Sequence, residues 1–254
     1  MLSCSWNAKN TMTHNASDDM KHRRTFFKRV AIIPIAAAGG TGALLSASPT
    51  PTAAAPEPTS ASPYVFSFFS KDEQAFLTAA CNRLIPADEH GPGAVELGAL
   101  EFLDRHMQTP YTTGGIWYMQ GPFLDASASF GYQGRLVLRD ILREGIKAMD
   151  AHSKTQFDGK VFAGLSPSQQ DQMLKDVEGG KIEFEAVPAK VFFSSLLGEV
   201  RNGYFSDPKH GGNKDMGSWK MIGYPGMRAD YIDWVSVRDK PYPIGPVDLA
   251  GRRG

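Results

Sequence analysis

Apolar residues recur at helical spacing in several segments of the chain. The clearest stripe follows Gln133, where apolar positions fall at i, i+3, i+4, i+7, i+8 and i+11 and charged residues take the other faces. The stripe consists of Leu138, Ile141, Leu142, Gly145, Ile146 and Met149. This spacing predicts an amphipathic helix that packs through the stripe.

Two further helices are predicted before this one. The first starts after Ser70, because Ser70 and Glu73 stand at capping-box spacing, and it stops at Pro86. Cys81 lies on its apolar stripe, which predicts a buried, inert thiol rather than a nucleophile. The second helix is predicted from Val95 to Met107.

Two helices are predicted after the stripe. One has Ser166 as its N-cap, Pro167 in its first turn and Gly179 just past its end. The other presents one apolar face, made of Phe193, Leu196, Leu197, Val200 and Tyr204. No run of alternating residues indicates strands, so the predicted fold class is mainly α. We expect a single helical domain with long irregular Gly/Pro/aromatic-rich loops.

Two regions lack a helical period. Residues 109–132 are rich in glycine and aromatic residues and are predicted to form an ordered loop. After Phe205 the sequence again becomes rich in Gly, Pro and aromatic residues, up to the terminal DKPYPIGPVDLAGRRG. Such segments do not build a regular core alone. They predict surface loops and an extended C-terminal arm that lies along something else.

The N-terminal region has the pattern of an export signal. Basic residues precede an apolar run from Val30 to Leu45, which is shorter than a membrane span and contains Pro34. The basic part resembles a twin-arginine signal, whose route carries folded proteins. The resemblance is carried by Arg23, Arg24, Phe26, Phe27 and Lys28. The sequence predicts a signal region at 1–48, a Pro/Ala/Ser/Thr-rich linker at 49–63 and a folded domain at 64–254.

Charge and cysteine content narrow the function. Removing residues 1–55 takes away six of the 27 Lys/Arg and two of the 27 Asp/Glu, so a net charge near −4 remains. Nucleic acid is therefore not an expected partner, because it requires a basic surface. Only Cys81 of the two cysteines remains, so no internal disulfide is possible.

Folded export usually serves a cofactor inserted in the cytoplasm, yet the chain carries no motif for one. C-x-x-C-H, a cysteine cluster, H-E-x-x-H and G-x-S-x-G are all missing from the sequence. We therefore expect no catalytic, cofactor-binding or metal site in this chain. One consistent explanation is that the cofactor belongs to a partner without a signal of its own, which binds this chain before export.

Three segments resemble subunit 3, the small or gamma subunit, of membrane-bound gluconate 2-dehydrogenase. They are SKDEQAFLTAACNRLIP, DPKHGGNKDMGSWKMIGYPG and the terminal KPYPIGPVDLAGRRG. The resemblance runs from about Tyr64 to the end of the sequence, and the twin-arginine leader also matches. The loop at 207–226 is its most specific part.

The resemblance implies a three-part enzyme. A large flavoprotein subunit oxidises the sugar acid with FAD, and a multihaem c-type cytochrome subunit passes the electrons to ubiquinone. The small subunit holds no cofactor and helps the flavoprotein to mature and to leave through the twin-arginine translocase. The complex would lie at the periplasmic, outer face of the inner membrane. This chain would associate with the membrane through its partner subunits.

The loop at 207–226 is the candidate partner interface. Its candidate residues are Asp207, His210, Asn213, Trp219 and Tyr224. Aromatic residues in such a loop anchor the loop itself or a protein interface.

Other functions remain open. One is the small subunit of a related sugar or polyol dehydrogenase. A second is a stand-alone metal protein that uses Asp207, His210 and Asp215, although their spacing is not typical of a metal site. A third is a stand-alone periplasmic sugar-binding protein that uses the aromatic residues of 111–132.

Overall fold

The computed structural model describes residues 64–124 and 127–254. The predicted export-signal residues Arg23, Arg24, Phe26, Phe27 and Lys28, and the predicted linker at 49–63, lie outside the described residues. Within the described part the fold is helical and contains isolated β-bridges but no strand. The predicted mainly α fold class is confirmed.

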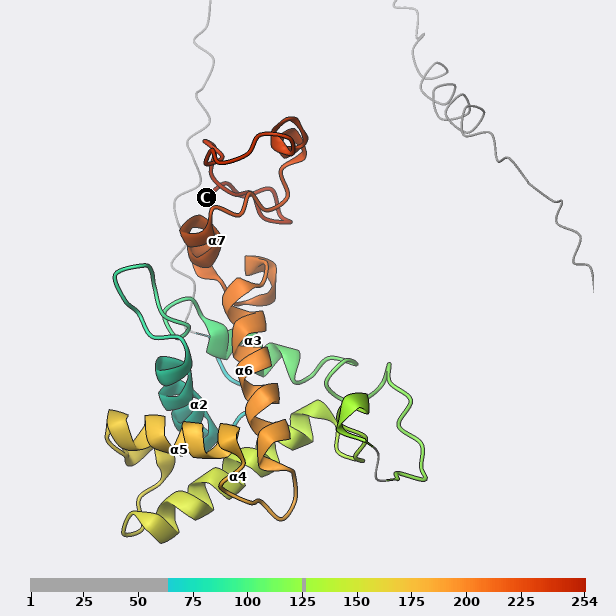
Figure 1. The fold of residues 1–254 in the computed structure, drawn as a ribbon. Helices are drawn as coiled ribbons and strands as arrows, with labels where there is room; N and C mark the ends of the chain where they lie inside the picture. Colours follow the sequence, from blue (N-terminus) through green and yellow to red (C-terminus); the bar gives the residue numbers. More distant parts are fainter. Residues whose placement is uncertain (1–63, 125–126) are drawn as a thin grey trace, which may run out of the picture. The chain divides into compact units, whose positions relative to one another are not determined.

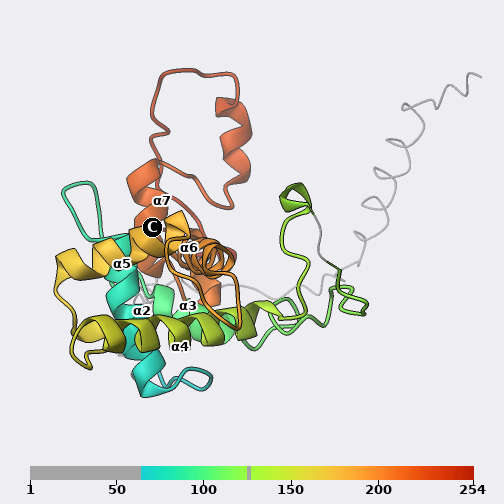
Figure 2. The same cartoon turned by 60° about the horizontal axis from the view of Figure 1, so that its bottom comes forward.

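Helix α6 is the element around which the others pack. It contacts α3, α4 and α5, and α2 contacts α3, α4, α5 and α6 (Figures 1 and 2). The helices are α2 (Lys71–Leu84), α3 (Ala99–His106), α4 (Leu138–Gln156), α5 (Pro167–Gly179), α6 (Ala189–Phe205) and α7 (Gly217–Ile222). The short 3-10 helices are η2 (Ala128–Phe130), η3 (Phe162–Gly164), η4 (Pro208–His210), η5 (Lys214–Met216) and η6 (Ala229–Trp234).

The capping residues act as the sequence predicts. Ser70 and Glu73 form a reciprocal capping box at the start of α2, and Ser166 forms a second one with Gln169 at the start of α5. Helix α5 includes Gly179, and Gly180 is the left-handed C-cap with φ 70°. The helix is therefore one residue longer than predicted.

Helix α3 is shorter than the predicted helix from Val95 to Met107. Its N-cap is Gly98, which adopts a left-handed φ of 78°. A left-handed residue cannot continue an α-helix, so residues 95–98 form turns instead. The apolar spacing before Gly98 indicated burial correctly, since Leu97 is buried, but it did not indicate the break.

The predicted stripe of α4 is the face that meets α6. Its central members, from Ile141 to Met149, are buried, while Leu138 is half-buried. At Gly145 an added Cβ would overlap the ring of Phe192 on α6. Glycine is therefore required at this point for the two helices to approach closely.

The core also confirms the expected environment of Cys81. Its side chain is buried with the apolar residues of α2, and burial raises the pKa of the thiol to about 12. A thiol with such a pKa stays protonated at neutral pH and is a poor nucleophile.

Candidate partner-binding surface

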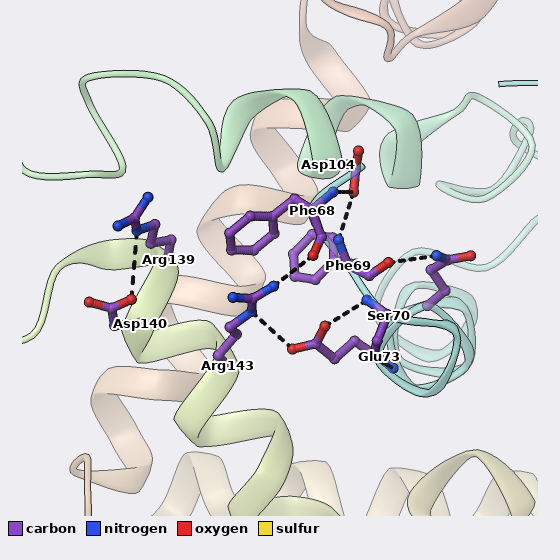
Figure 3. A network of polar contacts seen from close by, with 9 residues as sticks. Phe68, Phe69, Ser70, Glu73, Asp104, Arg139, Asp140 and Arg143 are labelled. Carbon is purple, nitrogen blue, oxygen red and sulfur yellow. Dashed lines mark hydrogen bonds and ion pairs between the residues drawn. The ribbon is translucent and has the colours of Figure 1, made fainter. Parts of the chain in front are cut away.

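A buried carboxylate, that of Asp104, binds the first residues of the described part of the chain. Asp104 of α3 is buried, and its two oxygens accept hydrogen bonds from residues 64–70, the N-terminal anchor (Figure 3). The donors are the Tyr64 hydroxyl at 2.8 Å, the Ser67 N–H at 2.9 Å and hydroxyl at 3.1 Å, and the N–H groups of Phe68 at 3.0 Å and Phe69 at 2.9 Å. Burial by itself raises the pKa of Asp104, but the hydrogen bonds from Phe69, Ser67, Tyr64 and Phe68 together outweigh it and hold the pKa below its usual value. The carboxylate thus fixes the start of the domain against α3.

Arg143 of α4 holds the same anchor from the other side. Its Nη2 donates to the Phe68 carbonyl oxygen at 2.6 Å, and its guanidinium carbon lies 4.0 Å from the centre of the Phe68 ring (Figure 3). Its Nε also donates to Glu73 Oε1 at 3.2 Å, while Glu73 Oε2 accepts the Ser70 N–H. The N-terminal anchor is thereby tied to α2, α3 and α4 at once.

The 207–226 loop is joined to the last residues of the chain through Asp207. Oδ1 of Asp207 accepts the Lys209 N–H at 2.9 Å and caps η4, and Oδ2 accepts the Leu249 N–H at 2.8 Å. We call residues 246–254 the C-terminal tail. The tail has a buried carboxylate of its own, Asp248. Its Oδ1 accepts the N–H groups of Ala250 and Arg252 at 3.0 and 2.8 Å, and its Oδ2 accepts the Arg252 Nε–H at 2.6 Å. Both carboxylates therefore hold backbone in place.

Asn213 organises the interior of the loop. It is buried, with a left-handed φ of 44°. Its Oδ1 accepts the N–H and the hydroxyl of Ser218 at 3.0 and 2.8 Å, and its Nδ2 donates to the Ser206 carbonyl at 2.9 Å. Asp215 and Met216 also have positive φ, at 55° and 56°. Such backbone persists where the surroundings over-determine it, and Asn213 supplies much of that constraint.

Trp219 joins the loop to the end of α6. Its side chain is 5% exposed, its Nε1 donates to the Phe205 carbonyl at 2.9 Å, and its ring meets Tyr224 edge-on at 5.1 Å. Gly226 follows with φ 65°, and a Cβ there would overlap the carbonyl oxygen of Val247. Close approach of the tail therefore requires glycine at this position.

The structure divides the predicted interface residues into three groups by their burial. Asn213 and Trp219 are buried and shape the loop, Asp207 is half-buried and bonded to backbone, and His210 and Tyr224 are exposed. The exposed pair can contact a partner without rearrangement of the loop. The interface itself stays a prediction.

The alternative metal site at Asp207, His210 and Asp215 gains no support from the geometry. Across residues 64–124 and 127–254, no three or more His, Cys, Asp or Glu side chains are arranged to hold a metal ion. Both oxygens of Asp207 already accept backbone N–H groups.

A groove between α3 and α6 borders a pair of residues, His106 and Glu199, that the sequence motifs did not single out. It has a volume of about 700 Å³ and is lined chiefly by Phe102, His106, Tyr111, Arg201, Asn202 and Phe205. Behind His106 lies Glu199, whose side chain is 5% exposed and whose Oε2 is 3.4 Å from His106 Nε2. Oε1 accepts the Asn202 Nδ2–H at 3.1 Å, whereas Oε2 has no partner with hydrogen-bond geometry.

Burial shifts both members of this pair toward neutrality. It raises the pKa of Glu199 to about 7, partly opposed by the hydrogen bond from Asn202. Burial also lowers the pKa of His106, and the nearby His210 adds to that effect. The signal in the sequence was a glutamate between Leu196 and Val200, on the apolar face of a helix.

Large apolar side chains are exposed in two stretches. In the aromatic loop, residues 109–132, they are Tyr111, Ile116, Trp117, Tyr118, Phe123, Leu124 and Phe130. In residues 221–249 they are Met221, Ile222, Tyr224, Met227, Tyr231, Ile232, Val235, Val237, Ile244 and Leu249. Clusters of this kind typically mark sites of protein–protein contact.

An open groove adjoins the aromatic loop. Its volume is about 840 Å³, and it lies between residues 123–124 and 131–136 on one side and the first turns of α6 on the other. Tyr132, Arg135, Lys190 and Ser194 are among the residues that line it. Cationic and hydroxyl groups beside an aromatic ring suit a small polyhydroxy anion.

These features define a helical domain that exposes two apolar stretches and two grooves, which are surfaces suited to contact with other molecules. Comparison with protein families then identifies it: the chain belongs to the gluconate 2-dehydrogenase subunit 3 family, whose model matches residues 71–226. The match covers α2 through α7 and the 207–226 loop. Neither the search of curated proteins nor the search of solved structures found a match. Membership of a subunit family implies assembly with other subunits of a dehydrogenase complex.

Proposed function

We propose that this chain is the small, non-catalytic subunit of a membrane-bound, FAD-dependent gluconate 2-dehydrogenase. In this proposal it is needed for assembly of the flavoprotein subunit and for its export by the twin-arginine route. The complex oxidises D-gluconate to 2-keto-gluconate at the periplasmic face of the inner membrane. Electrons pass through a multihaem cytochrome c subunit to ubiquinone. The observation that carries the proposal is the family match over residues 71–226.

The structure adds support of a different kind. The aromatic loop and residues 221–249 expose large apolar side chains that the domain does not bury in its own core. Exposed apolar surface of this kind is typical of a protein that binds a partner. None of the helices in the described part of the chain combines the length and apolar character needed to cross a bilayer. The proposal places membrane association in the complex.

Purification of the tagged chain from its native membranes tests the proposal. We expect a stoichiometric flavoprotein with a flavin absorption spectrum, a haem-bearing third chain, and D-gluconate oxidation with a quinone acceptor. A single colourless chain at every detergent and salt condition would overturn the proposal. Oxidation of another sugar or a polyol by the same complex would identify the related dehydrogenase instead.

The export part has its own test. Replacing Arg23 and Arg24 with lysine should leave both this chain and the flavoprotein in the cytoplasm, since a lysine pair lacks the arginines that the route reads. Cell fractionation with immunoblotting measures both proteins. A flavoprotein that still reached the periplasm would show that it does not depend on this chain.

The groove beside the aromatic loop supports a second candidate, a sugar-acid-binding role for the chain itself. Arg135 and Lys190 at this groove would recognise a carboxylate, and Tyr132 and Ser194 would face hydroxyl groups. Titration calorimetry of the isolated chain with D-gluconate tests this role. Saturable binding that is lost in Arg135→Gln would support it, and no heat at millimolar gluconate would rule it out.

A further inference from the structure

The segment between the 207–226 loop and the C-terminal tail forms a closed loop, which we call the terminal loop (residues 227–245). Its two ends meet: the Met227 N–H donates to the Val247 carbonyl at 2.7 Å, and the Val247 N–H donates to the Pro225 carbonyl at 3.1 Å. Arg228 Nε closes the base further by donating to the Gly245 carbonyl at 2.6 Å. In Figure 1 it is the red segment that leaves α7 and returns toward it.

Aromatic rings brace the terminal loop from inside. The ring of Tyr242 meets Tyr231 at 5.1 Å and Trp234 at 5.6 Å, both edge-on. Tyr231 and Trp234 belong to η6, so the rings hold that short helix against the returning segment around Tyr242. The backbone path is thus fixed at its base and in its middle. A loop ordered in advance loses less conformational entropy when it binds.

The terminal loop directs its apolar side chains outward. Ile232 is 76% exposed and Val235 is 70% exposed, and Met227, Val237 and Ile244 are exposed as well. These side chains are not part of the core formed by the described helices. A braced loop with an apolar outer face is suited to insertion into an apolar recess of another protein.

The charges of the terminal loop favour a protein over a lipid surface as its partner. The loop carries Arg228, Arg238 and Lys240 against Asp230, Asp233 and Asp239, so its formal charge is zero. Segments that bind anionic membranes carry an excess of lysine and arginine, which this loop lacks. The family model ends at Gly226, where the terminal loop begins.

We propose that the terminal loop is the element by which this subunit docks into an apolar recess on the flavoprotein subunit of its complex. This docking role rests on the proposed function, which supplies the flavoprotein as the partner. It deepens the proposed function by naming the segment that binds that partner. Ile232 and Val235 are the contact residues, and Arg228, Tyr231, Trp234 and Tyr242 keep the loop in its binding shape.

The test compares tagged variants purified from native membranes, with the captured flavoprotein quantified by its flavin absorbance. The test variant is Ile232→Ser with Val235→Ser, and Ile232→Glu is a second variant at the same surface. The matched control is Val65→Ser with Val161→Ser, which removes two exposed valine side chains outside the terminal loop. Thermal melts of the purified chains check that each variant is folded.

We expect both terminal-loop variants to melt like the wild type and to capture at least about tenfold less flavoprotein, while the control captures the wild-type amount. Equal capture by all variants would overturn the docking role and leave the proposed function intact. A wild-type chain that captures no flavoprotein would instead remove the proposed function itself. Altered self-association of the terminal-loop variants, with unchanged capture, would identify a second copy of the chain as the occupant and would also overturn the proposal.

Discussion

Glu199 of α6 and His106 of α3 meet at the interface of their helices, with Oε2 of the glutamate 3.4 Å from Nε2 of the histidine. His106 is stacked between the rings of Phe102, at 5.1 Å, and Tyr111, at 5.5 Å. The pair therefore lies between the buried core and the groove between α3 and α6. A titratable pair at such a site makes the stability of the domain depend on pH.

We expect Glu199 to make the domain less stable as pH rises from about 4.5 to about 7. Its pKa is raised from 4.5 to about 7, so in this range the folded chain retains a proton that the unfolded chain has lost. The stabilisation is complete below pH 4.5 and is lost as pH passes 7. His106 acts in the opposite sense, because its pKa is lowered and the folded chain gives up its proton first as pH rises.

Replacing Glu199 with glutamine should remove the glutamate contribution. Relative to the wild type, the variant should gain up to about 3 kcal/mol in unfolding free energy between pH 4.5 and pH 8. Urea unfolding at several pH values measures the difference, and Glu183→Gln, at an exposed position, is the control. Parallel curves for wild type and variant would show that Glu199 titrates normally.

Asp104→Asn should destabilise the domain by about 3 kcal/mol or more, since the amide presents an NH2 group to N–H donors that the carboxylate satisfies. The pKa of Asp104 is lowered, so its stabilisation is present above the usual carboxyl range and is lost as pH falls through the folded-state value. The wild type should thus lose its advantage over the variant in strong acid. Asp171→Asn, which breaks the surface ion pair with Arg83, should change stability little. An equal loss in both variants would contradict the anchoring role of Asp104.

Gly226→Ala should disrupt the closure of the terminal loop, and Gly223→Ala provides a matched control. Both glycines have left-handed φ, 65° and 69°, so both alanines carry a penalty of about 1–2 kcal/mol. A Cβ on Gly223 meets nothing within 4 Å, whereas one on Gly226 overlaps the Val247 carbonyl oxygen. We expect Gly226→Ala to cost about 1–3 kcal/mol more and to speed hydrogen exchange at the Met227 and Val247 amides. Equal exchange rates in the two variants would show that the tail does not depend on this contact.

Gly145→Ala and Gly198→Ala should have opposite effects. Both sites are in helix interiors, where alanine is favoured over glycine by about 0.5–1 kcal/mol. A Cβ on Gly198 meets nothing within 4 Å, so that variant should be stabilised. On Gly145 it overlaps the ring of Phe192, and we expect a net loss of about 1–3 kcal/mol in denaturant unfolding. A stabilised Gly145→Ala would show that α4 and α6 can separate without cost.

The helices could be predicted because their signals are local. The capping boxes at Ser70 and Ser166 and the stripe of α4 depend on residues within a few turns of one another. The first and last residues of a helix are harder to predict: α3 begins only after Gly98, later than the predicted start at Val95. The choice of a left-handed Gly98 depends on its neighbours in space, since a Cβ there would lie 2.8 Å from the Gly211 carbonyl oxygen.

The candidate site was only partly predictable. The composition marked the region after Phe205 and the family resemblance marked the 207–226 loop, but the burial of Trp219 and Asn213 depends on where α6 ends and how the loop folds back on it. Asp104 looked like an ordinary charged residue of an amphipathic helix, and Glu199 stood on an apolar helix face without any sign of what would cover it. Their burial follows from the N-terminal anchor covering one and α3 covering the other, which are long-range contacts.

The sequence by itself determined the helical class, the caps, the faces that would be buried and the family resemblance, because helical periodicity and capping act over three or four residues. Only the tertiary structure decided which polar groups became buried, where glycine permits close approach, and how the C-terminal tail closes the terminal loop onto Gly226. These outcomes depend on side-chain volume and hydrogen-bond partners brought together from distant segments. Burial shifts the pKa of Glu199, and the closure of the terminal loop leaves Ile232 and Val235 exposed. Composition alone specifies neither outcome.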